Sequence, residues 1–166
     1  MADAVSLLPL SGKINLRGRP DDPTFRDAVA GVLGFAPPAD PNRAVLGPVS
    51  LYWLQPTSWL VEAPLDGIAD LTARLRAAVG PAGTAVDVSD TRLTYRIAGP
   101  GALDLLAKGC ALDLHPRVFP AGRSALCAFA QLHVLLVKID EEPAFHLFVP
   151  RGAQRHVEKW FSAAHQ

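Results

Sequence analysis

Cysteine and histidine residues are the first candidates for chemistry in this chain, because thiolates and imidazoles bind metal ions. Cys110 and His115 stand five positions apart, and Cys127, His133 and His146 follow within segments typical of strands. Zinc sites usually contain repeated Cys or His pairs at short spacing, and this sequence has one loose pair with no second. We therefore interpret Cys110 as a small apolar side chain at a helix end and Cys127 as a core residue of a strand, and we expect no metal site.

Acid–base and phosphate chemistry have little support in the sequence. Asp113, with a leucine on either side, is the best candidate for a buried acid, but a turn residue that bonds to nearby backbone is the interpretation we favour. His115 is a candidate base with no nucleophile or orienting group near it in the sequence. Gly99-Pro100-Gly101 lacks the other residues of a dinucleotide or P-loop motif, which favours a tight turn. We expect no catalytic or cofactor-binding residue in this chain.

Aromatic side chains and arginines near predicted turns indicate binding to another protein, since this composition is typical of protein interfaces. Tyr52 and Trp53 are adjacent on one predicted strand, so their side chains point to opposite faces, and one of those faces is a candidate for cover by a partner. The alternative is that the aromatic rings fill the core, which we favour for Trp160. The candidate interface residues are Arg17, Tyr52, Trp53, Trp59, His115 and Arg117.

Composition and charge exclude several classes of protein. The 166 residues are 49% hydrophobic and 19% charged, which argues against extended disorder. The 16 Lys and Arg balance the 16 Asp and Glu, so nothing favours binding to nucleic acid or an anionic membrane. No run of 18 apolar residues or secretory segment is recognised, and two free thiols suit a reducing compartment. We expect a cytoplasmic protein.

Periodicity divides the chain into short strands and helices. Asp22-Pro23 begins a helix that Gly34 ends, and Asp66 is the expected cap of a second helix. Arg92, Thr94 and Arg96 alternate with apolar residues, which predicts one solvent-exposed face of a strand. The segments 36–48 and 109–122 have no periodicity. The predicted strands are 13–17, 49–54, 59–62, 84–88, 93–97, 126–129, 133–139 and 145–149, and further helices begin near 101 and 151.

The order of these elements contains an internal repeat. A strand, a turn, a strand and a helix occur over 49–79 and again over 133–164, each preceded by a strand and a helix. Strands and helices without regular βαβ alternation predict an α+β fold. Because half of the chain is small for an independent core, we expect a single domain over 1–166, with two pseudo-equivalent halves of β-α-β-β type that share a mixed or antiparallel sheet.

The run Gly109-Cys-Ala-Leu-Asp-Leu-His-Pro-Arg-Val-Phe-Pro-Ala-Gly-Arg123 closely resembles the gamma subunit of heterotetrameric sarcosine oxidase. The resemblance covers nearly the whole chain and includes Ser11–Gly18, Tyr52–Trp59, Asp87–Asp90, Ile97–Pro100 and Phe145–Val149. It implies a fold similar to the folate-binding part of the glycine-cleavage aminomethyltransferase.

The resemblance also implies a function and partners. It implies a structural subunit of a complex that oxidises sarcosine to glycine, transfers the one-carbon unit to tetrahydrofolate and produces hydrogen peroxide. The implied partners are an alpha subunit with NAD and a folate-binding half, a beta subunit with FAD and FMN, and a delta subunit with zinc. The gamma chain, by this resemblance, binds none of these cofactors.

Two departures from related patterns bear on the function. Aminomethyltransferases place an aspartate after a glycine-rich turn between two central strands, whereas residues 128–136 here contain no acid. Gln55, Thr57-Ser58 and Leu126-Cys127 also depart from the gamma pattern. They leave open a related complex that demethylates another N-methylated amine. A stand-alone folate-dependent protein, and a folate-fold assembly factor with a reactive cysteine in Lys108-Gly109-Cys110, are further alternatives.

Overall fold

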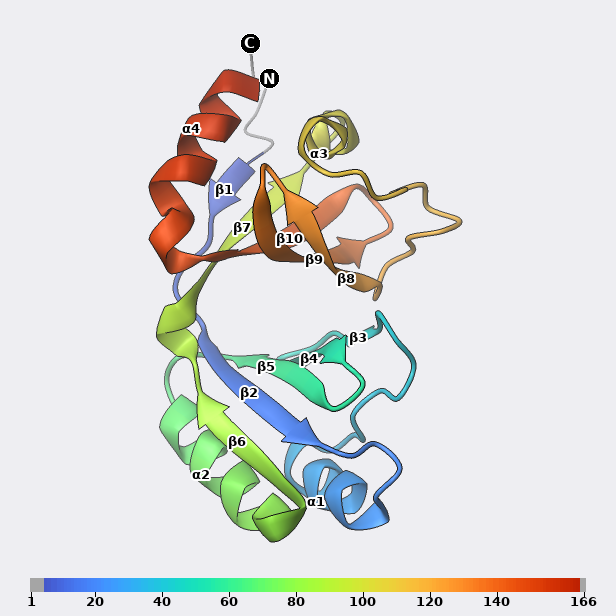
Figure 1. The fold of residues 1–166 in the computed structure, drawn as a ribbon, viewed down its shortest axis with the longest axis vertical. Helices are drawn as coiled ribbons and strands as arrows, with labels where there is room; N and C mark the ends of the chain where they lie inside the picture. Colours follow the sequence, from blue (N-terminus) through green and yellow to red (C-terminus); the bar gives the residue numbers. More distant parts are fainter. Residues whose placement is uncertain (1–4, 165–166) are drawn as a thin grey trace. The chain divides into compact units, whose positions relative to one another are not determined.

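The computed structural model describes residues 5–164, which form two compact units (Figure 1). The 10–89 unit is continuous in sequence, whereas the 90–164 unit also includes residues 5–9. Single-turn 3₁₀ helices lie at η1 (Gly80–Ala82), η2 (Ser89–Thr91) and η3 (Arg151–Ala153).

The 10–89 unit contains an antiparallel sheet with two helices on one face (Figure 1). Its helices are α1 (Pro23–Leu33) and α2 (Ile68–Val79). Alternate strand residues such as Ile14 and Leu16 form one core with helix residues such as Phe25 and Leu75. The strands are β2 (Gly12–Gly18), β3 (Ala44–Val45), β4 (Ser50–Gln55), β5 (Ser58–Ala63) and β6 (Gly83–Asp87), in the order β3-β4-β5-β2-β6.

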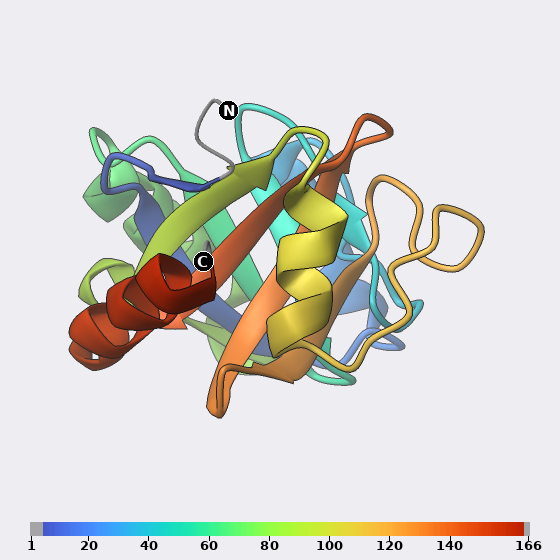
Figure 2. The ribbon, with the colours of Figure 1, turned by 90° about the horizontal axis from the view of Figure 1, so that it is seen from above.

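The 90–164 unit repeats this arrangement, with α3 (Ala102–Gly109) and α4 (Gln154–Ala164) packed against its antiparallel sheet (Figure 2). Leu106 of α3 and Val157 of α4 belong to the same buried cluster as strand residues such as Leu147. The strands are β1 (Val5–Leu7), β7 (Arg92–Ala98), β8 (Ser124–Phe129), β9 (Leu132–Asp140) and β10 (Ala144–Pro150), in the order β1-β7-β10-β9-β8.

The two sheets correspond strand for strand. The order β3-β4-β5-β2-β6 matches β8-β9-β10-β7-β1, so β1 takes the position that β6 has in the other unit. The predicted α+β class and the repeated halves are therefore confirmed. The expectation of one shared sheet and core is corrected, because each unit has its own sheet, and its two helices bury their apolar stripes on that sheet.

Helix ends and strand faces agree with most local predictions. Asp22 accepts a hydrogen bond from the backbone N–H of Thr24 at 2.9 Å, and Gly34 ends α1 with φ of 84°, a conformation that favours glycine. The prediction that Asp66 caps α2 is wrong, because the capping position is Gly67, whose φ of 86° again suits a residue without a side chain. Thr94 is also buried rather than exposed, as is Phe148 opposite it on β10.

Candidate functional site

Two of the six candidate interface residues, Tyr52 and Trp59, have buried side chains. The indole N–H of Trp59 donates a hydrogen bond of 2.9 Å to the carbonyl oxygen of Pro38, and its ring stacks on Phe25 with 5.6 Å between centroids. Trp59 therefore fixes the predicted loop after α1 against the core of the 10–89 unit. The side chains of Tyr52 and Trp59 are therefore buried in the folded chain and stabilise the β4–β5 hairpin.

The other four candidates are accessible to different degrees. Arg17 is exposed near the end of β2, where its Nε donates to Asn15 Oδ1 at 3.2 Å. Trp53 is half-buried on β4 and packs against the core cluster of the unit. His115 and Arg117 are exposed on the irregular stretch between α3 and β8. This stretch, residues 110–123, is called the 110–123 segment below.

The 110–123 segment has a defined conformation although it contains no strand or helix. Leu114 and Phe119 are buried in the core cluster of the 90–164 unit. The backbone N–H of Phe119 donates to the carbonyl oxygen of His115 at 2.8 Å, and that of Arg117 donates to His115 Nδ1 at 3.2 Å. The two buried side chains anchor the segment in the core of the unit, and the two hydrogen bonds fix a local turn within it.

The outward side of the 110–123 segment combines apolar and cationic side chains. Leu112 and Val118 are exposed, Val118 to 52%, and so are His115 and Arg117 of the same segment. Asp113 is exposed and accepts a hydrogen bond from the backbone N–H of His115 at 2.9 Å, which confirms the interpretation of a turn residue. An anchored segment that presents apolar residues beside an arginine is typical of a protein-binding surface.

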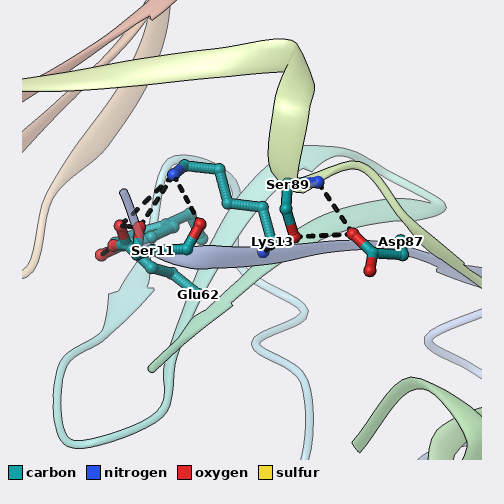
Figure 3. A network of polar contacts seen from close by, with 6 residues as sticks. Ser11, Lys13, Glu62, Asp87 and Ser89 are labelled. Atoms are coloured by element: carbon teal, nitrogen blue, oxygen red, sulfur yellow. Dashed lines mark hydrogen bonds and ion pairs between the residues drawn. The ribbon is translucent and has the colours of Figure 1, made fainter. Parts of the chain in front are cut away.

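A buried polar network in the 10–89 unit joins β2, β4 and β5 and was not predicted from the sequence (Figure 3). The ammonium group of Lys13, only 1% exposed, donates to Ser11 Oγ at 2.8 Å and lies 4.0 Å from Glu62 Oε1. Ser11 Oγ donates to the same Glu62 oxygen at 2.5 Å, and the phenol of Tyr52 donates to Glu62 Oε2 at 2.6 Å. Both carboxylate oxygens of Glu62 therefore accept a hydrogen bond, one from Tyr52 on β4 and one from Ser11, the residue before β2.

The network is suited to holding strands together rather than to reaction chemistry. Burial raises the pKa of the Tyr52 phenol far above its ordinary value, and the charge of Glu62 and the hydrogen bond to it act in the same direction. Tyr52 is therefore a neutral donor at physiological pH. Lys13 and Glu62 are directly opposite each other on β2 and β5. Their opposite charges could have predicted this contact from the sequence, but only if the register of the two strands had been known.

The same figure shows a second polar connection from Lys13, through its backbone (Figure 3). The N–H of Lys13 donates to Ser89 Oγ at 2.9 Å, and the hydroxyl of Ser89 donates to Asp87 Oδ1 at 2.6 Å. The hydroxyl and the backbone N–H of Ser89 both lower the pKa of Asp87. The end of β6 is thereby fixed beside the start of β2.

A cavity of about 320 Å³ lies in the 90–164 unit between α3, α4 and the β8–β9 turn. Trp160 and His156 contribute from α4, and His156 Nε2 lies 2.8 Å from the carbonyl oxygen of Ala130. The ammonium group of Lys108 donates to the carbonyl oxygen of Ala164 at 2.6 Å. The residues that line the cavity are Lys108, Gly109, Ala130, Gln131, His156 and Trp160, and this set contains no carboxylate.

The metal-ligand candidates do not assemble into a site. Among residues 5–164, no group of three or more His, Cys, Asp or Glu side chains has an arrangement that would hold a metal ion. Cys110 and Cys127 do meet each other, with 3.8 Å between their sulfur atoms. Burial raises the pKa of the Cys127 thiol to about 12, with a further contribution from Cys110.

Across residues 5–164, no helix is long and apolar enough to span a membrane.

Comparison with known sequences identifies one family. A family model described as the sarcosine oxidase, gamma subunit family matches residues 17–166. The sarcosine oxidase subunit gamma of Corynebacterium sp. strain P-1 is 35% identical over 146 residues, which cover 80% of this chain and 70% of that protein. The subunit gamma of Corynebacterium sp. strain U-96 is 33% identical over 152 residues, covering 89% of this chain and 72% of that protein.

Comparison with solved structures agrees with this result. A chain of the heterotetrameric sarcosine oxidase from Corynebacterium sp. U-96, in complex with pyrrole 2-carboxylate, has a TM-score of 0.88 and 26% identity, covering 96% of this chain and 82% of that chain. The glycine cleavage system aminomethyltransferase T from Bartonella henselae has a TM-score of 0.67 and 13% identity, covering 95% and 44%, and shows a shared fold alone. The resemblance seen in the sequence is confirmed, and the chain belongs to the sarcosine oxidase gamma subunit family.

Proposed function

We propose that this chain is the gamma subunit of a heterotetrameric sarcosine oxidase and that its role there is structural rather than catalytic. The observation that carries the proposal is the similarity to a chain of the U-96 heterotetramer, over 96% of this chain and with a TM-score of 0.88. Family membership over residues 17–166 supports the same conclusion. The reactive groups of the complex then belong to the partner subunits.

In this proposal the complex oxidises sarcosine to glycine, transfers the one-carbon unit to tetrahydrofolate and reduces oxygen to hydrogen peroxide. NAD and the folate site belong to the alpha subunit, FAD and FMN to the beta subunit, and zinc to the delta subunit. The departures at Gln55 and Thr57-Ser58 keep another N-methylated amine as the alternative substrate. We also propose a cytoplasmic location, since the free thiols of Cys110 and Cys127 suit a reducing compartment.

A folate site does not fit the residues at the β8–β9 turn. The β8–β9 turn contains Ala130 and Gln131, and no carboxylate lines the cavity beside it. A folate site like that of the aminomethyltransferases requires a carboxylate between the central strands, so in this proposal the folate step takes place on the alpha subunit.

We place the principal contact with the alpha subunit on the 110–123 segment. Its exposed Leu112 and Val118 supply apolar area, and His115 and Arg117 supply donors around that area. Arg17 and Trp53 remain candidates on the 10–89 unit. An obligate interface removes roughly 2,000 Å² or more from water, so the segment would form one part of a larger contact.

Co-purification tests this proposal. The tagged chain is expressed with alpha, beta and delta subunits, and the recovered material is analysed by mass and by flavin absorbance. We expect the wild-type chain to recover larger, flavin-containing chains. The pair Arg117→Glu and Val118→Asp should reduce that recovery roughly tenfold or more, because both changes fall on the exposed side of the segment.

Arg155→Glu is the matched control, since Arg155 is exposed on α4 of the same unit but lies outside the segment. This variant should recover partners as the wild-type chain does, and circular dichroism checks that all variants are folded. A wild-type chain that never co-purifies with flavin-containing subunits contradicts the proposed function. Equal recovery by the segment variants contradicts only the placement of the interface. Titration of the isolated chain with tetrahydrofolate is expected to show no binding, and tight binding would favour the stand-alone alternative.

A further inference from the structure

Cys110 and Cys127 come from different elements, yet their sulfur atoms are 3.8 Å apart. Cys110 is the buried residue at the C-terminal end of α3, and Cys127 is a half-buried residue in the middle of β8. The backbone N–H of Leu112 donates to Cys110 Sγ at 3.5 Å. This bond and the packing of both cysteines in one cluster keep the two sulfur atoms facing each other.

The two cysteines lie at the two ends of a stretch that includes the 110–123 segment. Cys110 begins the 110–123 segment, and Cys127 lies on the strand that follows it. We propose that Cys110 and Cys127 are an oxidative modification site, at which a peroxide converts the two thiols into a disulfide that closes the 110–123 segment into a covalent loop. The inference rests on the sulfur positions and does not depend on the proposed function.

The reaction balances with hydrogen peroxide as the oxidant. One sulfur attacks a peroxide oxygen, the O–O bond breaks, and a sulfenic acid and one water molecule result. The second sulfur then attacks the sulfenic sulfur, the S–S bond forms, and the hydroxyl group leaves as a second water molecule with the remaining thiol proton. Two electrons pass from the thiols to the peroxide, and two thiols and one peroxide yield one disulfide and two water molecules.

Formation of this bond requires a small movement of the two sulfur atoms. The sulfur atoms are 3.8 Å apart, and a disulfide needs about 2.05 Å between them, so they must approach each other by about 1.75 Å. Cys110 has an extended backbone conformation at the end of α3, where the irregular segment begins. Since the pKa of Cys127 is raised by burial, its thiolate is scarce at neutral pH, and the reaction is expected to be slow.

Peptide mapping of the full chain tests the proposal. The reduced protein is treated with hydrogen peroxide or with diamide, a thiol oxidant, and remaining thiols are then blocked with an alkylating reagent. We expect a monomer that has lost two hydrogen atoms, takes up no alkyl group, and releases a peptide pair joined through Cys110 and Cys127. Dithiothreitol should restore both thiols. Cys110→Ser and Cys127→Ser are matched controls, and neither should form an internal crosslink.

Three outcomes would overturn the inference: thiols that remain fully alkylatable after prolonged treatment, disulfides only between chains, or separate sulfinic acids with no crosslinked peptide. Because the wild-type protein carries the primary readout, the test remains decisive even if a serine variant folds poorly. If the chain is purified within a larger assembly, the same peptide mapping applies, since it reads only this chain's peptides.

Discussion

Lys13 on β2 and Glu62 on β5 are direct cross-strand partners, and their charged groups approach to 4.0 Å with side chains only 1% and 15% exposed. Ser11 and Tyr52 donate to the same carboxylate, so three side chains converge on Glu62. The buried ammonium group and carboxylate thereby compensate part of each other's cost of leaving water.

Replacement of Lys13 by methionine should destabilise the chain by roughly 2–4 kcal/mol, because it leaves the carboxylate of Glu62, only 15% exposed, without its cation. Urea denaturation followed by circular dichroism measures the change. Lys138→Met is the matched control. Lys138 is also buried, but its partner Glu141 is 66% exposed and can be hydrated, so a loss below about 1 kcal/mol is expected. Equal losses for the two variants would contradict this account.

The two tyrosines of the chain should resist ionisation. Burial is the main cause that raises the pKa of Tyr95 to about 12, and it raises that of Tyr52 further. Because the folded chain keeps phenol protons that the unfolded chain loses, the contribution of the tyrosines to stability should be constant below about pH 10 and fall as the pH rises from about 10 towards 12. Ultraviolet titration of the native chain should show no tyrosinate step near pH 10, whereas the urea-unfolded chain should show both. A step near pH 10 in the native chain would refute this prediction.

Replacement of Ser89 by alanine should destabilise the chain by about 1–2 kcal/mol at neutral pH, because it removes a donor to Asp87 and the acceptor for the backbone N–H of Lys13. The pKa of Asp87 is lowered in the folded chain, so its contribution is present above the ordinary carboxyl pKa and is lost as the pH falls through the lowered value. The difference between wild type and variant should therefore shrink in acid. Ser89→Thr keeps the hydroxyl group and serves as the control; if it loses as much stability as the alanine variant, the hydroxyl group is not the cause.

Two tryptophans on one hairpin should respond differently to replacement by phenylalanine. Trp59→Phe should cost roughly 2–3 kcal/mol, because it removes the hydrogen bond to Pro38 and volume from a fully buried position. Trp53→Phe should cost about 1 kcal/mol or less, because its buried indole nitrogen has no hydrogen-bond partner among residues 5–164. Denaturation midpoints measured by circular dichroism compare the two. A larger loss at Trp53 would reverse the assignment of their roles.

The sequence alone predicted the elements whose causes are local. Asp22 and Gly34 mark the ends of α1 because a capping side chain and a left-handed residue act within one helical turn. The strands β7 and β10 and the turn at Asp113 depend on neighbours a few positions away, but the exposed face predicted for β7 was wrong at Thr94, which is buried. The motif between Gly109 and Arg123 was also sufficient to indicate the family. Asp66 was mispredicted because Gly67 competes for the same capping position through its backbone alone.

Only the tertiary structure decided which distant residues meet. The sheet of the 90–164 unit is completed by β1, which pairs with β7 some 90 positions away in the chain. The contact of Lys13 with Glu62 required the register of β2 against β5, and the contact of Cys110 with Cys127 required the packing of α3 on its sheet. Such contacts follow from the burial of whole apolar faces, which no local pattern specifies, whereas caps, turns and alternation are set by bonds within a few residues.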